Sequence, residues 1–155
     1  MNYDRDLLDT NVVSEYSRDT LPNARVRKWV DAQNEDTLYL SVLTFGEIRK
    51  GTALLPAGKK RSYLERWVDI DLPARFANRL LPINSQIAEI WGTMAAEAQQ
   101  KGIGLPIIDG LIAATAKHHD LAIVTRNERD FRMWGIPVTN PWTFDPRTQS
   151  SSSSH

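Results

Sequence analysis

The stretch LPIIDGLIAATAKHHDLAIVTRN, from Leu105 to Asn127, is the part of the sequence that most directly indicates the fold. A long apolar run follows Pro106, and proline suits the first turn of a helix, so a helix is expected from about Asp109 to His118. Ala122 to Val124 then form a short apolar run that ends in Thr125-Arg126-Asn127, which predicts a buried strand. A helix followed directly by a buried strand is the repeating unit of an α/β domain.

The same alternation of short apolar runs and helical patterns extends outward over the rest of the chain. Further strands are expected at Leu7 and Leu8, Leu38 to Val42, Leu80 to Ile83 and, as an edge strand, Val138 and Thr139. Further helices are expected at Val12 to Ser17, from Pro22, over TFGEIRKGTALL, at Lys59 to Ile70 and at Ser85 to Lys101. The pattern predicts a single α/β domain, a three-layer α/β/α sandwich around a central parallel sheet.

Length and composition place the chain among ordinary globular domains. Its 155 residues suit one domain, expected at 1–145, and the polar end PRTQSSSSSH, 146–155, is expected to be a disordered tail or an artificial remnant. No apolar run approaches the roughly 20 residues of a membrane span, and acids stand where a signal peptide would be apolar, so a cytoplasmic protein with no membrane contact is expected. The absence of cysteine excludes disulfides and thiolate chemistry.

The charge balance and the missing motifs exclude several classes of binding and catalytic site. Lysine plus arginine balance aspartate plus glutamate at 19 each, so any contact with nucleic acid must be local. The sequence contains no dinucleotide-binding glycine motif, no P-loop, no zinc-protease HExxH and no serine nucleophile elbow. The adjacent His118 and His119 point about 100° apart on a helix and are expected to be ordinary residues of its C-terminal end.

Three acids stand at positions where a ligand site is expected. Asp9 ends the first strand, Glu47 follows Gly46 inside a helix, and Asp109 lies in a first helical turn. Singly, Asp9 can be a helix cap, Glu47 an ordinary exposed glutamate and Asp109 a simple first-turn acid. Against the plain interpretation of Glu47, a glycine inside a helix is costly, so Gly46 indicates a close approach there. Together they can converge at the carboxyl ends of parallel strands, where carboxylates repel one another unless a cation neutralises them. Oxygen ligands favour Mg²⁺ or Mn²⁺.

Four motifs, in this order, resemble those of a known family. The first is LLDTNVVSE at Leu7 to Glu15, the second is SVLTFGEIRKG at Ser41 to Gly51, and the third and fourth lie in IDGLIAATAKHHDLAIVTRNERDF at Ile108 to Phe131. The ending VTNPW at Val138 to Trp142 also resembles one branch of this family. The sequence thereby resembles the PIN-domain family, and in particular the VapC and FitB-like toxins of bacterial type II toxin–antitoxin pairs. The resemblance implies an α/β/α sandwich, a homodimer, and an Mg²⁺- or Mn²⁺-dependent endoribonuclease held inactive by a cognate antitoxin, with DNA contacted only through that antitoxin.

The resemblance also implies which residues form the site. By position, Asp9, Glu47 and Asp109 match the family's acidic metal ligands and catalytic residues. The fourth polar position is either Asn127 or Asp130: Asn127 is favoured because it directly follows a strand, although a carboxylate is the stronger ligand.

Two further expectations concern RNA and the partner copy. Arg49, Lys50 and Arg126 are candidates to position RNA phosphates. Trp29, Trp67 and Trp91 offer apolar surface for a second copy of the chain.

Two other functions remain open at this point. One is an aspartate-based phosphotransfer or phosphatase domain with Asp9 as nucleophile, although Asn11 stands where the phosphatase pattern has a second aspartate. The other is a non-catalytic module that binds a protein or RNA, in which the acids only cap helices.

Overall fold

Five parallel strands form the centre of the computed structural model, which describes residues 4–17 and 21–145. Within that part of the chain, the strands lie side by side in the order β3-β2-β1-β4-β5. Their bounds are β1 Asp6–Leu8, β2 Leu38–Ser41, β3 Leu80–Leu81, β4 Ala122–Val124 and β5 Val138–Thr139. The expectation of a disordered tail or remnant concerns 146–155, which lie outside the described residues.

The sheet is parallel because each strand returns through a helix to the same edge. β1 is central: Leu7 lies opposite Tyr39 of β2 and Ile123 of β4. Leu7 and Ile123 are completely buried, as expected for strands that are covered on both faces. The predicted α/β architecture with a central parallel sheet is therefore confirmed.

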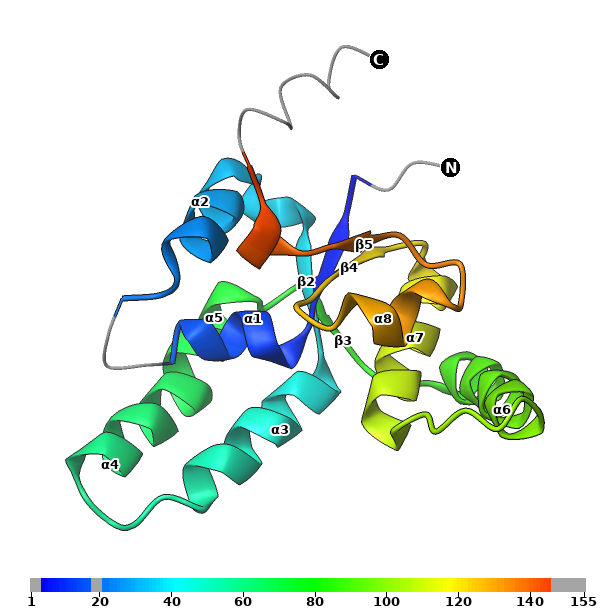
Figure 1. The fold of residues 1–155 in the computed structure, drawn as a ribbon. Helices are drawn as coiled ribbons and strands as arrows, with labels where there is room; N and C mark the ends of the chain where they lie inside the picture. The colour runs from blue at the N-terminus through cyan, green and yellow to red at the C-terminus, as the bar shows by residue number, and fades with distance from the viewer. Residues whose placement is uncertain (1–3, 18–20, 146–155) are drawn as a thin grey trace.

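Helices cover both faces of the sheet (Figure 1). Leu8 packs on one face with residues of α1, α2, α3 and α5, while Leu7 packs on the other face with residues of α6, α7 and α8. The helices are α1 Thr10–Glu15, α2 Ala24–Ala32, α3 Val42–Ala53, α4 Lys59–Arg66, α5 Leu72–Arg75, α6 Ser85–Gln100, α7 Ile107–His119 and α8 Glu128–Arg132. Among the residues described, no helix is long and apolar enough to span a bilayer.

Three helical segments differ from the sequence prediction. The helix predicted at Lys59 to Ile70 continues further, since a π-helical turn, η2 (Trp67–Asp71), connects α4 to α5. The helix predicted from about Asp109 begins two residues earlier, at Ile107, because Pro106 serves as its N-cap. The short helix α8 was not predicted, because its sequence ERDFR has one apolar residue and no detectable period.

Two expectations about individual side chains are wrong. A Cβ added to Gly46 would meet no atom of the described structure within 4 Å, so Gly46 does not mark a close approach. Trp29 is 3% exposed and belongs to the core of its sheet face, so it offers no surface to a second copy; Trp67 and Trp91 are half-buried against the two cores. The expectation is therefore wrong for Trp29, whereas Trp67 and Trp91 keep part of their surface exposed.

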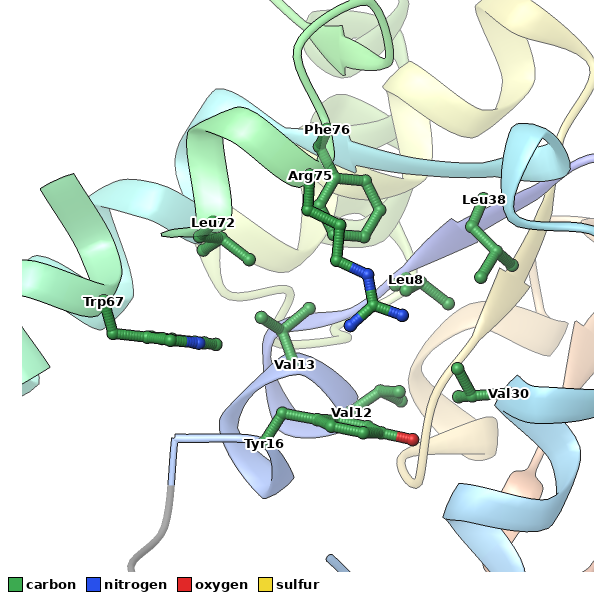
Figure 2. A pocket seen from close by; sticks show the side chains of 10 residues that line it. All are labelled: Leu8, Val12, Val13, Tyr16, Val30, Leu38, Trp67, Leu72, Arg75 and Phe76. Carbon is green, nitrogen blue, oxygen red and sulfur yellow. The ribbon is translucent and has the colours of Figure 1, made fainter. Parts of the chain in front are cut away.

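An apolar pocket lies under α1 on the Leu8 face of the sheet (Figure 2). It has a volume of about 30 Å³, enough for about one water molecule. None of the three predicted acids lines it. The residues around it are Leu8, Val12, Val13, Tyr16, Val30, Leu38, Trp67, Leu72, Arg75 and Phe76.

Candidate metal centre

Three predicted acids and Asp130 lie at the edge of the sheet where the strands end. Asp9 directly follows β1, Glu47 lies in α3 behind β2, Asp109 lies in the first turn of α7, and Asp130 lies in α8 behind β4. Their charges act on one another: Glu47 and Asp130 raise the pKa of Asp9, and all three raise the pKa of Asp109. We call these four residues the acid cluster.

Asp9 is the most firmly held member of the acid cluster. It is 4% exposed and caps α1, with Oδ1 accepting a hydrogen bond from the Thr10 amide at 2.8 Å. Its other oxygen, Oδ2, accepts from the Thr125 hydroxyl at 2.8 Å. Thr125 reaches it because β1 and β4 are neighbouring strands, and the Asp9 amide donates to the Val124 carbonyl. The sheet therefore fixes both oxygens of this carboxylate.

Asn11 connects the start of α1 to the turn after β4. Its Nδ2 lies 3.2 Å from Thr125 Oγ1, and its Oδ1 accepts from the Arg126 amide at 3.3 Å. The same Thr125 oxygen accepts from the Asn127 amide at 3.0 Å. These bonds hold the turn that leads to α8, and with it Asp130, against the strand that carries Asp9.

Glu47 is connected to α1 through Thr10. Thr10 Oγ1 donates to Glu47 Oε1 at 2.5 Å and lies 3.3 Å from the hydroxyl of Thr44, which is completely buried. Thr44 lies one helical turn before Glu47 on α3, so both face α1. The contact orients the Glu47 carboxylate toward the sheet edge.

Burial and repulsion by neighbouring carboxylates raise the pKa values of Asp9 and Asp109. Burial is the larger cause of the raised pKa of Asp9, and hydrogen bonds from Thr125 and Thr10 offset it in part. Burial and then the charges of Asp9, Asp130 and Glu47 raise the pKa of Asp109 to about 6. A site of this kind lacks positive charge, and a cation would remove the repulsion.

The donor set fits a hard divalent ion. The four carboxylates of the acid cluster offer oxygen, which Mg²⁺ and Mn²⁺ prefer. Within residues 4–17 and 21–145, no group of three Asp, Glu or His side chains is already arranged to hold a metal ion. Mg²⁺ is usually held by one or two carboxylates together with water, so the cluster meets its needs without direct ligation by every acid.

The two candidates for the fourth position differ in their surroundings. Asn127 is exposed, and its side chain does not cap α8. Asp130 lies one turn further on and is half-buried, and its charge raises the pKa values of Asp9 and Asp109.

The three basic candidates lie in different places. Arg49 forms an ion pair with Asp69 of η2, on a different side of α3 from Glu47. Lys50 is exposed in the last turn of α3. Arg126 lies in the turn after β4, where its amide donates to Asn11 Oδ1, and its guanidinium lies over the ring of Trp142.

Sequence reasoning missed the residues that position the acids. Thr10, Asn11, Thr44 and Thr125 make most of the hydrogen bonds described above, and Thr44 and Thr125 are completely buried. A threonine at the end of an apolar strand or inside a packed helix is the signal that could have indicated them, because buried hydroxyls need partners.

Gly110, next to Asp109, was also missed. A Cβ at this position would lie 2.9 Å from Cδ1 of Trp91 and 3.1 Å from Cδ2 of Leu105. The glycine therefore lets α6 and α7 pack closely, and this packing fixes the helix turn that carries Asp109.

Comparisons with known proteins agree with this arrangement. The model of the PIN domain matches residues 7–133. Toxin FitB of Neisseria gonorrhoeae is 40% identical over 136 residues, covering 88% of this chain and 97% of FitB. VapC ribonuclease Y4jK of Sinorhizobium fredii is 37% identical over 136 residues, covering 88% of this chain and 96% of the relative.

A solved structure of FitAB bound to an IR36 DNA fragment contains a chain that superimposes with a TM-score of 0.83 at 38% identity. The match covers 90% of this chain and 97% of the other. The family model, the sequence identities and the superposition all point to the same family. The chain therefore belongs to the PIN-domain family, in its group of VapC and FitB toxins.

Proposed function

We propose that this chain, a ribonuclease toxin of the VapC family, cleaves RNA at the acid cluster. The observation that carries the proposal is the electrostatic coupling of Asp9, Glu47, Asp109 and Asp130 at the carboxyl edge of the sheet. Family membership favours this function over the aspartate-based phosphotransfer domain and over the binding module.

In this proposal Asp9 and Asp109 hold Mg²⁺ or Mn²⁺, and Glu47 and Asp130 complete its surroundings. The ion supplies an activated water and stabilises negative charge on the phosphodiester. Thr125 and the Thr10 amide keep the Asp9 carboxylate in one orientation, and the Thr10 hydroxyl does the same for Glu47. We assign the fourth position to Asp130 in preference to Asn127, because its charge acts on both ligands.

The experiment that tests the function is incubation of the purified chain with RNA and Mn²⁺, Mg²⁺ or EDTA. We expect cleavage with either ion and none with EDTA. Formation of an acyl phosphate at Asp9 would instead support the phosphotransfer alternative, and inertness with both ions would support the binding module.

Metal binding should depend on pH. Below pH 6 the carboxyl of Asp109 is mostly protonated and must lose its proton to bind an ion, because its pKa is raised to about 6. The affinity for Mn²⁺, measured by calorimetric titration, is therefore expected to rise by about tenfold per pH unit below that pKa and to level off above pH 7. An affinity that stays constant from pH 5 to pH 8 would contradict the assignment of Asp109.

We also propose that a cognate antitoxin inhibits the chain, that DNA is contacted only through that antitoxin, and that the chain acts as a cytoplasmic homodimer. The FitAB structure, which contains a chain similar to this one together with DNA, supports the first two parts. Co-purification with the product of the neighbouring gene and light scattering of the chain alone test the partners. A monomer at micromolar concentration would contradict the dimer.

A further inference from the structure

The side chain of Arg126 lies over an aromatic ring, and its backbone lies in the turn between β4 and α8. Its guanidinium carbon lies 5.2 Å from the centre of the Trp142 ring, within the range of a cation–π interaction. Its backbone amide donates to Asn11, the residue that also contacts Thr125. Both ends of Arg126 are therefore fixed, although the residue is exposed.

Trp142 provides a rigid support for this arginine. It lies in the 3₁₀ turn η3 (Pro141–Thr143), which follows β5 and packs on α2 (Figure 1). The backbone of Trp142 is fixed because its amide donates a hydrogen bond to Asn140 Oδ1 at 2.9 Å. Its ring is partly buried against the core that contains Val26 and Val30. The indole can thus hold the guanidinium in one place.

The charge of Arg126 remains available to a ligand. Within the part of the chain that the structure describes, Arg126 takes part in none of the ion pairs between side chains. Arginines elsewhere do pair with carboxylates: Arg49, Arg61, Arg75 and Arg132. A cation–π contact holds a guanidinium without neutralising it, and the planar donor fork matches a phosphate.

An open hollow adjoins this arginine. It has a volume of about 570 Å³ and is lined by Arg126, Asn127, Glu128, Arg129, Asp130 and Arg132. Arg126 and Asp130 of the acid cluster both line this hollow, so an RNA strand that reaches the cluster can also contact Arg126.

We infer that Arg126, supported by Trp142, binds an RNA phosphate next to the one that is cleaved. Arg126 is the contact, and Trp142 is a positioning residue that acts through it. This inference rests on the proposed function and adds a substrate contact to it. Trp142 lies beyond residues 7–133, which the PIN-domain model matches, so the segment after the shared domain contributes to the RNA site.

The binding test uses a labelled random-sequence single-stranded RNA of 20 nucleotides and the Asp109→Asn background, which prevents cleavage. Arg126→Gln is expected to weaken binding about tenfold and to reduce the slope of log affinity against log salt by about 0.7, the value for one phosphate contact on a single strand. The control Lys117→Gln removes the same charge at the opposite end of α7 and should change neither quantity. An unchanged salt slope in Arg126→Gln would overturn the inference.

The role of Trp142 is tested by kinetics in the otherwise unchanged chain. Trp142→Met keeps apolar packing but removes the aromatic face, and we expect KM to rise several-fold with little change in kcat. Trp142→Phe keeps an aromatic face and should restore most of the wild-type KM. Because Trp142 acts through Arg126, Trp142→Met should add no further increase of KM to Arg126→Gln.

Additive effects in the double variant would overturn the role of Trp142. The outcome is distinguishable from failure of the proposed function: a wild-type chain that does not cleave RNA with Mn²⁺ contradicts the function, whereas a cleaving wild type with an unaltered Arg126→Gln variant contradicts this inference alone.

Discussion

Replacing Asp9 by asparagine is expected to reduce metal-dependent RNA cleavage at least about 100-fold while the chain remains folded. The substitution removes the charge that the ion requires. The local structure should survive, because asparagine is as good a helix cap as aspartate and can still accept from the Thr10 amide. Steady-state cleavage with saturating Mn²⁺ and thermal unfolding without metal measure the two effects separately.

Asp109→Asn and Glu47→Gln should act in the same direction. Each removes one charge from a cluster whose members repel one another in the absence of metal, so the free energy of unfolding without metal should stay constant or rise. Glu97→Gln is the matched control, since it makes the same change on the exposed side of α6. A variant with near wild-type turnover would show that the substituted acid is not a ligand.

Replacing Asp6 by asparagine is expected to stabilise the chain at pH 8 by about 2 to 4 kcal/mol. Asp6 starts β1 between β2 and β4 and is 7% exposed. Burial, with a smaller effect of the Asp4 charge, raises its pKa from 3.8 to about 7. At pH 8 the folded chain must therefore hold a buried negative charge, and asparagine removes it.

The pH dependence follows from the sign of this shift. The folded chain binds a proton at Asp6 more tightly than the unfolded chain does, so this residue contributes most stability below pH 4. That contribution falls by about 1.4 kcal/mol per pH unit and is lost as the pH rises through 7. The difference between Asp6→Asn and wild type, measured by urea unfolding from pH 4 to pH 8, isolates it from other acids.

Asp4→Asn serves as the control because Asp4 is exposed. It should give a much smaller change than Asp6→Asn, because it only relieves a minor cause of the raised pKa of Asp6. Equal stability of Asp6→Asn and wild type at pH 8 would show that the Asp6 carboxylate is solvated in the folded chain.

The fold could be predicted from sequence wherever apolar periodicity was strong. Buried parallel strands such as Ala122–Val124 appear as short apolar runs, and the stripe of α6 appears at helical spacing. The continuation through η2 and the helix α8 depend on tertiary packing: Val68 and Phe131 are each buried in a core that only the folded chain provides. A local sequence pattern does not show which distant residues will bury these side chains.

The acid cluster could be predicted in part for the same reason. The carboxyl ends of parallel strands bring Asp9 and Asp109 to one edge, and that follows from topology alone. Which residue after β4 faces them depends on the path of the chain through α8, a helix that the sequence did not reveal. The preference for Asn127 over Asp130 relied on distance along the chain, and the charge of Asp130 acts on the cluster from the next turn.

Asp9 and Thr125 form a hydrogen bond although they are far apart in the sequence, so the bond can form only late in synthesis. These residues are 116 positions apart, and β1 needs β4 as its neighbour before Asp9 is held. A nascent chain that ends at residue 100 contains Asp9 and Glu47 but lacks Asp109, Asp130 and the strand that joins them. Such a chain therefore lacks two members of the acid cluster and the strand that fixes the Asp9 carboxylate.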